Sequence, residues 1–235
     1  QQPVPFDFVI NGEFLRTTVA QHLTDRGLSS EETVTIEYLI ALPAPQEVAK
    51  QEDESWVSSL SYASTLFAGM ASGVVKAHSE TELLATSQAV LRDMESRAVK
   101  AVAARETGDT THLLVAGKAN IVHLLRYDGE FHREKAFAGH EGSVEAVGFS
   151  PDGARFVSGG WDKTVRLWNV GQEAEDSADR TRTRENDAAV VESSVLEGHQ
   201  QAVVDVQWPV AHQVISCALD NNLTIWDAGL MAVAS

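Results

Sequence analysis

Two segments of the sequence contain a histidine, a serine, an aspartate and a tryptophan at matching spacing. Serine precedes aspartate by four positions in both segments, and aspartate precedes tryptophan by six. The residues are His140, Ser158, Asp162 and Trp168 in the first segment and His199, Ser216, Asp220 and Trp226 in the second. Serine, histidine and aspartate are the residue types of a hydrolytic triad. Neither serine lies in a Gly-x-Ser-x-Gly turn, however, and the set recurs with a tryptophan each time. We therefore predict no catalytic residue among them.

A structural role explains this recurring set better. The aspartate can accept a hydrogen bond from the imidazole of the histidine, and the serine hydroxyl can bridge that imidazole and the indole N–H of the tryptophan. Every polar group then has a partner, which matters because an unpaired buried group costs about 1–3 kcal/mol. We predict that the two sets hold a fold together.

The segments around these residues have the pattern of a WD repeat. Each begins at a Gly-His pair, at 139–140 and 198–199, and ends at Trp168-Asn169 or Trp226-Asp227. Apolar and polar residues alternate between these ends, as they do in strands. A WD repeat of about 40–45 residues forms one four-stranded blade of a β-propeller. The expected fold class is therefore mainly β.

Two further blades are expected earlier in the chain, with the strand pattern but without the polar set. Residues 56–78 align with the first segment, and residues 98–125 align in the same way. The serine, aspartate and tryptophan positions hold Ala68, Ser72 and His78 in the former and Val115, Ala119 and Leu125 in the latter. About four blades are thus predicted, whereas an intact ring of this family commonly has about seven. We expect the remaining blades to lie beyond Ser235.

The N-terminal part has a different order of elements. The expected order is a strand at 6–10, an Asn11-Gly12 turn, a returning strand at 13–16, a short helix at 19–23 and a strand at 33–39. This order resembles the C-terminal half of a ubiquitin-like β-grasp domain, whose first hairpin and main helix we expect to precede Gln1. The predicted domains are this incomplete ubiquitin-like domain at 1–42, a linker at 43–55 and the WD-repeat blades at 56–235. The polar, mixed-charge residues 171–196 are interpreted as a flexible surface loop.

The composition excludes several classes of protein. The chain has 18 Lys and Arg against 34 Asp and Glu, a formal net charge of −16. A nucleic-acid-binding surface is disfavoured because it needs clustered cations, although direct RNA contact through Arg180, Arg182 and Arg184 stays open. Cys217 is the only cysteine, so an intrachain disulfide is excluded. No apolar run is long enough for a membrane helix and no signal-peptide pattern occurs, so we expect no membrane association.

The sequence contains no enzyme motif that we can identify. It has no phosphate-binding loop, and its histidines are scattered rather than spaced as metal ligands. They are His22, His78, His112, His123, His132, His140, His199 and His212. We therefore expect a non-enzymatic protein with no cofactor of its own.

The acidic ubiquitin-like domain, which we call the head, is followed by WD-repeat blades. This combination resembles the WD-repeat subunit of the PeBoW complex, a family that acts in the biogenesis of the large ribosomal subunit. The resemblance rests on residues 3–8, 15–17, 26–31 and 53–60, and it covers essentially the whole chain. It implies a scaffold in 60S biogenesis and pre-rRNA processing, located in the nucleus, nucleolus and nucleoplasm.

The resemblance also implies partners. The propeller would pair with the Bop-type WD-repeat protein, which in turn holds pescadillo, so that pescadillo is an indirect partner on the pre-60S particle. The head would be bound by the MIDAS domain of the midasin AAA ATPase, which releases the complex from pre-ribosomes. Glu31 matches the family's metal-reaching glutamate, with Glu32 as the alternative. Its carboxylate would complete the coordination of Mg²⁺ at the partner's MIDAS, since this cation takes carboxylate oxygens.

Other interpretations stay open. One alternative is a WD-repeat substrate adaptor of a ubiquitin ligase, in which the head mimics ubiquitin; this head lacks a Gly-Gly tail and continues into Ala41-Leu42-Pro43. For the partner-binding surface of the propeller, Trp161 and Lys118 are candidates because they occupy matching turn positions. Packing of Trp161 on a neighbouring blade is the competing explanation for that residue.

Overall fold

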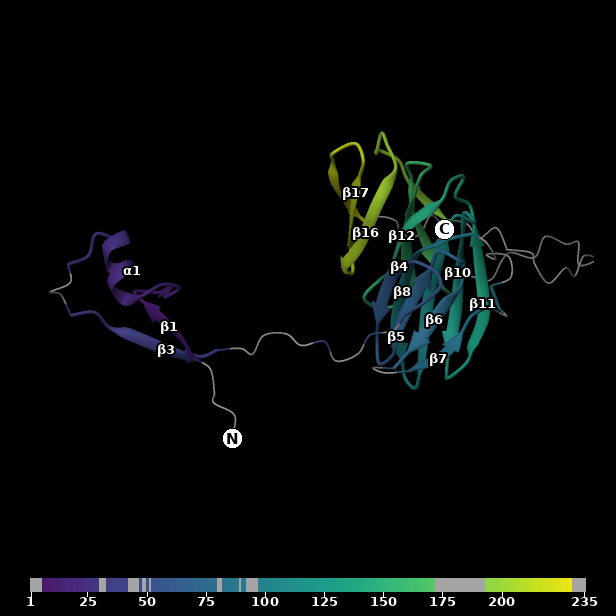
Figure 1. The fold of residues 1–235 in the computed structure, drawn as a ribbon. Coiled ribbons are helices and arrows are strands. Elements are labelled where there is room, and N and C mark those ends of the chain that lie inside the picture. Colours follow the sequence, from purple (N-terminus) through teal and green to yellow (C-terminus); the bar gives the residue numbers. More distant parts are fainter. Residues whose placement is uncertain are drawn as a thin grey trace, which may run out of the picture. The chain divides into compact units, whose positions relative to one another are not determined.

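The computed structural model confirms the mainly β fold and shows two compact units (Figure 1). It describes residues 6–29, 33–41, 47, 50, 52–79, 82–88, 90–91, 97–171 and 193–229. The first unit comprises residues 1–48 and the second residues 49–235. The boundary between them falls inside the segment 43–55.

The described residues of the first unit, the head, form a three-stranded antiparallel sheet and one short helix. Its elements are β1 (Phe6–Ile10), β2 (Glu13–Phe14), α1 (Val19–Asp25) and β3 (Ile36–Ile40), and the strand order is β2-β1-β3. Asn11 and Gly12 form the hairpin turn with φ values of 51° and 83°, and asparagine and glycine are the residues that most readily adopt positive φ in such a turn. Val9, Ile10 and Leu23 are buried in its small core. The element order is the predicted one, but the last strand begins at Ile36 instead of residue 33.

In the second unit, the described residues form four sheets that follow one another along the chain, each built from consecutive antiparallel strands. The first blade is β4 (Val57–Tyr62), β5 (Leu66–Met70), β6 (Val75–His78) and β7 (Leu83–Thr86). The second is β8 (Val99–Thr107), β9 (Thr110–Gly117), β10 (Ile121–Tyr127) and β11 (Phe131–Ala138). The third is β12 (Val144–Phe149), β13 (Arg155–Gly160), β14 (Val165–Asn169) and β15 (Ser194–Leu196). The fourth is β16 (Val203–Val210), β17 (Gln213–Ala218) and β18 (Leu223–Asp227), with three strands among the described residues.

The short strand β15 corrects the interpretation of residues 171–196 as a loop throughout. Val165 pairs with Leu196 and Leu167 with Ser194, so the end of the segment completes the third sheet. Leu196 is buried in the apolar core between the third and fourth blades. The polar residues that precede it masked this signal, because two apolar side chains are too few to define a strand by alternation. Residues 172–192 lie outside the described part of the chain.

Consecutive blades pack with their innermost strands, β4, β8, β12 and β16, side by side (Figure 1). The Ser59 hydroxyl accepts from the Val102 N–H at 3.0 Å, and the Ser61 hydroxyl accepts from the Ala104 N–H at 2.8 Å. The residue numbers of the hydrogen-bond partners increase together along β4 and β8, so these two strands run in the same direction. The first strands of the blades therefore begin at one common end of the unit.

A glycine in the second strand of a blade lets the next blade approach closely. A Cβ atom at Gly69 would lie 2.7 Å from Val99 Cγ1 and 2.8 Å from Val102 Cγ2. At the equivalent Gly159, a Cβ atom would lie 2.5 Å from Val203 Cγ1 and 2.8 Å from Val206 Cγ1. The same packing therefore recurs between the first and second blades and between the third and fourth.

We expect Gly159→Ala to destabilise the propeller by about 1–3 kcal/mol, because the added methyl group overpacks the interface with Val203. Urea unfolding followed by circular dichroism measures the change. Gly171→Ala is the matched control, since a Cβ atom there meets nothing within 4 Å, and it should change stability by less than about 0.5 kcal/mol. Equal stability of the two variants would contradict this account of blade packing.

Candidate functional site

The structure brings the first predicted polar set together in the third blade. His140 Nδ1 lies 2.7 Å from Asp162 Oδ2, and His140 Nε2 lies 2.7 Å from Ser158 Oγ. The indole N–H of Trp168 donates to Ser158 Oγ at 2.8 Å. With Nδ1 carrying the imidazole proton, the histidine donates to the aspartate and accepts from the serine hydroxyl. Every polar group in the chain from Asp162 to Trp168 is thus paired.

The fourth blade repeats this arrangement. His199 Nδ1 lies 3.0 Å from Asp220 Oδ2, His199 Nε2 lies 2.7 Å from Ser216 Oγ, and the Trp226 N–H donates to Ser216 Oγ at 2.8 Å. Ser158 and Ser216 are buried and their hydroxyl oxygens accept from indole N–H groups. Such hydroxyls cannot reach a substrate, so this geometry supports strand-to-loop attachment and not nucleophilic attack.

The two aspartates also hold the loop that precedes each blade. Burial of the Asp162 carboxyl opposes its ionisation, but hydrogen bonds from His140, the Glu141 N–H and the Thr164 hydroxyl hold its pKa well below the usual range. The Gln200 N–H, with help from Asn222 and His199, lowers the pKa of Asp220 to about 2 against the opposing effect of burial. Both side chains therefore stay ionised at neutral pH and fix the Gly-His loops.

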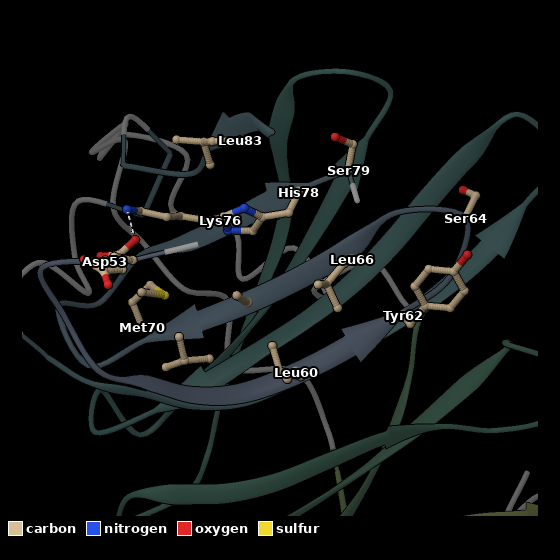
Figure 2. A pocket seen from close by; sticks show the side chains of 13 residues that line it. Asp53, Leu60, Tyr62, Ser64, Leu66, Met70, Lys76, His78, Ser79 and Leu83 are labelled. Carbon is tan, nitrogen blue, oxygen red and sulfur yellow. Dashed lines mark hydrogen bonds and ion pairs between the residues drawn. The ribbon is translucent and has the colours of Figure 1, made fainter. Parts of the chain in front are cut away.

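The first blade replaces this network with an ion pair (Figure 2). Asp53 lies three positions before Trp56, as His140 lies three before Ser143, and it forms an ion pair with Lys76 of β6. The Lys76 ammonium lowers the pKa of the Asp53 carboxyl. The last part of the predicted linker is therefore attached to the third strand of its blade, whereas the Gly-His loop of the third blade is attached to the second strand and to the turn that follows it.

A hollow lies on the face of the first blade that is turned away from the second blade, which we call its outer face (Figure 2). Its volume is about 620 Å³. Ala68 and His78 stand at the serine and tryptophan positions, and burial lowers the pKa of the His78 imidazole. Leu60 and Tyr62 line it and are 62% and 75% exposed. In the second blade, by contrast, Val115, Ala119 and Leu125 pack into the core against the first blade.

The predicted metal-reaching residue Glu31 and its alternative Glu32 lie outside the described residues. The segment leading to them is well anchored at the end of α1. The Arg26 N–H donates to the His22 carbonyl at 3.2 Å and the Leu28 N–H to the Leu23 carbonyl at 2.9 Å. Gly27, with φ 64°, makes the left-handed turn that ends the helix. Arg180, Arg182 and Arg184 also lie outside the described residues.

The two candidate interface residues of the propeller lie on its surface. Trp161, at the turn after β13, is 58% exposed, and its Cβ lies against Gly142 of the same blade. Lys118, at the matching turn after β9, is exposed. Trp56, which the sequence did not indicate as an interface candidate, is 85% exposed and lies just before β4. Its alignment with Ser143 could have indicated an exposed position, because both residues directly precede the first strand of a blade.

Neither a metal-binding cluster nor a membrane-spanning helix occurs in the part of the chain that the structure describes. No group of three or more His, Cys, Asp and Glu side chains in that part of the chain could hold a metal ion. No helix there is long and apolar enough to cross a membrane.

The blades and their polar networks define a WD-repeat protein of the β-propeller class. The WD domain, G-beta repeat family matches residues 131–169 and 191–227, and the NLE (NUC135) domain matches residues 1–23. The solved structure of U3-55K superposes with a TM-score of 0.60 at 16% identity, over 75% of this chain and 50% of that one. This likeness concerns the fold alone.

The predicted family resemblance is confirmed, because the homologues of this chain are ribosome biogenesis proteins of the WDR12 and YTM1 group. A ribosome biogenesis protein WDR12 homolog of Chlamydomonas reinhardtii is 31% identical over 99% of this chain and 58% of its own length. The ribosome biogenesis protein YTM1 of Candida glabrata is 28% identical over 96% of this chain and 40% of its own length. The chain thus spans between two-fifths and three-fifths of these relatives.

Proposed function

We propose that this protein is a non-enzymatic scaffold in the biogenesis of the large (60S) ribosomal subunit and in pre-rRNA processing. The observation that carries the proposal is the match to ribosome biogenesis proteins across 99% of the chain, which includes both the head and the blades. A match to the WD repeats alone would be common to many unrelated scaffolds. The buried state of Ser158 and Ser216 supports a binding role for the blades over a hydrolytic one.

The propeller would contribute by binding another protein. Its proposed direct partner is the Bop-type WD-repeat protein, through which pescadillo is held indirectly, and the assembly acts on the pre-60S particle. This work takes place in the nucleolus and nucleoplasm of the nucleus. Propellers suit such a role because a rigid ring of blades presents many loops on one surface.

The head would contribute the contact with a motor. We propose that the MIDAS domain of the midasin AAA ATPase binds it and thereby pulls the complex from the pre-ribosome. The Mg²⁺ ion belongs to that partner, and the head supplies one carboxylate oxygen, from Glu31 or alternatively Glu32. The net charge of −7 over residues 1–54, from ten acidic and three basic side chains, favours approach to a cationic metal site.

Affinity purification of the tagged chain from nucleolar extract, with and without ATP, tests this function. We expect the Bop-type protein, pescadillo and pre-60S components in both samples, and midasin in the sample without ATP. Capture dominated by ubiquitin ligase subunits would instead favour the substrate-adaptor alternative, and absence of all ribosomal components would refute the scaffold function.

A further inference from the structure

One backbone hydrogen bond recurs in all four blades and marks one end of the propeller unit. In each blade, the residue that opens the turn after the second strand donates its N–H to the carbonyl of the residue just before the first strand. The pairs are Ala71 to Trp56 at 2.8 Å, Lys118 to Ala98 at 3.1 Å, Trp161 to Ser143 at 2.9 Å and Leu219 to Ala202 at 2.9 Å. These eight residues therefore occupy equivalent places at one end of the unit, where Ala202 is buried. We call the exposed surface at this end, formed by the other residues and by Arg97 next to Ala98, the turn surface.

A β-bulge at the start of each innermost strand adds one more position to the turn surface. The register shifts between Val57 and Ser59 in β4, and equivalent shifts occur in the other three innermost strands. The residues within the shifts are Ser58, Lys100, Glu145 and Val204. A bulge leaves its extra residue out of the ladder and re-aims its side chain. The turn surface is thus a built feature of every blade.

Side chains of two kinds alternate across the turn surface from the first blade to the third. Trp56 of the first blade is 85% exposed, and Trp161 of the third blade is 58% exposed. The second blade lies between them and contributes Arg97 and Lys118, both exposed. Lys100 of the same blade reaches Glu145 of the third at 3.7 Å. Leu219, 49% exposed, extends the apolar part onto the fourth blade.

The pattern on this surface is that of a protein-binding site. Trp168 and Trp208, in contrast to Trp56 and Trp161, are buried. Tryptophan is the residue most enriched at the energetic centres of protein interfaces, because its large apolar area is desolvated by a partner. Among the described residues, Lys118 forms no ion pair, so its ammonium group is available to an incoming carboxylate.

We propose that the turn surface binds an acidic protein segment, in which carboxylates contact Lys118 and Arg97 while apolar side chains on either side pack on Trp56 and Trp161. The proposal rests on the proposed function only in that the propeller is taken to bind protein, and it adds the residues and the chemistry of the ligand. RNA is the less suitable ligand, because it carries a negative charge at every nucleotide and the chain's net charge of −16 repels each of them. A protein segment can instead confine its carboxylates to the contacts with Lys118 and Arg97.

Binding of a glutamate–tyrosine copolymer to the full chain tests this inference without any ribosomal partner. Isothermal titration calorimetry would compare the copolymer with polyglutamate and with a short oligouridylate. We expect the copolymer to bind best, polyglutamate more weakly and oligouridylate least. Lys118→Glu and Trp161→Ala should each weaken copolymer binding by about tenfold or more.

Two control variants separate the turn surface from general effects of charge and exposure. Lys50→Glu changes the same charge in the segment before the blades, and Tyr62→Ala removes a 75% exposed aromatic ring from the outer face of the first blade. Both should bind like the unchanged chain. Absent copolymer binding, equal loss in the control variants, or preference for oligouridylate would each overturn the proposal. A failure here with ribosomal partners still captured would leave the proposed function standing.

Discussion

Trp168→Ala is expected to destabilise the propeller unit by about 3–5 kcal/mol, which is the usual cost of removing a large buried aromatic side chain. Trp168 is only 1% exposed. Its ring stacks on Phe156 at a centroid distance of 5.8 Å and meets Phe137 edge-on at 5.8 Å. Its N–H also donates to the buried Ser158 hydroxyl, which would lose a partner. The expected loss of stability therefore has two causes, a cavity between the second and third blades and a broken polar network.

Urea unfolding measured by circular dichroism tests this expectation, with two further variants for comparison. Trp168→Phe keeps part of the ring packing but removes the N–H, so its cost should lie between those of the unchanged chain and Trp168→Ala. Trp161→Ala is the matched control, because that tryptophan is 58% exposed, and it should cost less than about 0.5 kcal/mol. A Trp168→Ala cost near that of the control would show that the network is not structural.

The polar networks were predictable from sequence because blade geometry fixes their spacing. Asp162 lies four positions after Ser158, since the strand must end and the tight turn must begin within that length. Six more residues bring the chain back along β14 to Trp168, opposite Phe156 in the ladder. A spacing that is fixed by backbone hydrogen bonds can be recognised in the sequence even when overall sequence identity is low.

Other features of the structure have no recognisable pattern in the sequence. The Asp53–Lys76 ion pair joins the histidine position to the position that Arg166 holds in the third blade, so the spacing of the polar set did not predict it. Strand β15 follows a long polar segment, and its two apolar residues, Val195 and Leu196, are too few to signal a strand. Trp56 is exposed because it lies before the first strand. The alternation of apolar and polar residues predicts only which face of the sheet a strand residue occupies, so it could not predict this exposure.

Glu31→Ala is expected to abolish metal-dependent binding of the head to the MIDAS domain of midasin while leaving the fold and the propeller's partner binding unchanged. Mg²⁺ is a hard cation that takes carboxylate oxygens, and alanine offers none. Losing one partner of a desolvated charge pair commonly costs about 2–5 kcal/mol, which corresponds to a weakening of well over tenfold. Glu31→Asp should also weaken binding, because its shorter side chain withdraws the oxygen by about one C–C bond.

A pull-down of the chain variants with the isolated MIDAS domain, in Mg²⁺ and in EDTA, distinguishes a metal ligand from a nearby charge. Glu37→Ala is the matched control, since Glu37 is an exposed glutamate of the same head, in β3. General electrostatic attraction would make Glu31→Ala and Glu37→Ala equally weak and would leave some binding in EDTA. If Glu31 coordinates the metal, Glu31→Ala in Mg²⁺ should bind the MIDAS domain as poorly as the unchanged chain does in EDTA, whereas Glu37→Ala should bind normally. If Glu32→Ala has that behaviour instead, the ligand is the neighbouring glutamate, and binding that persists in both variants would remove the metal contact from the proposed function.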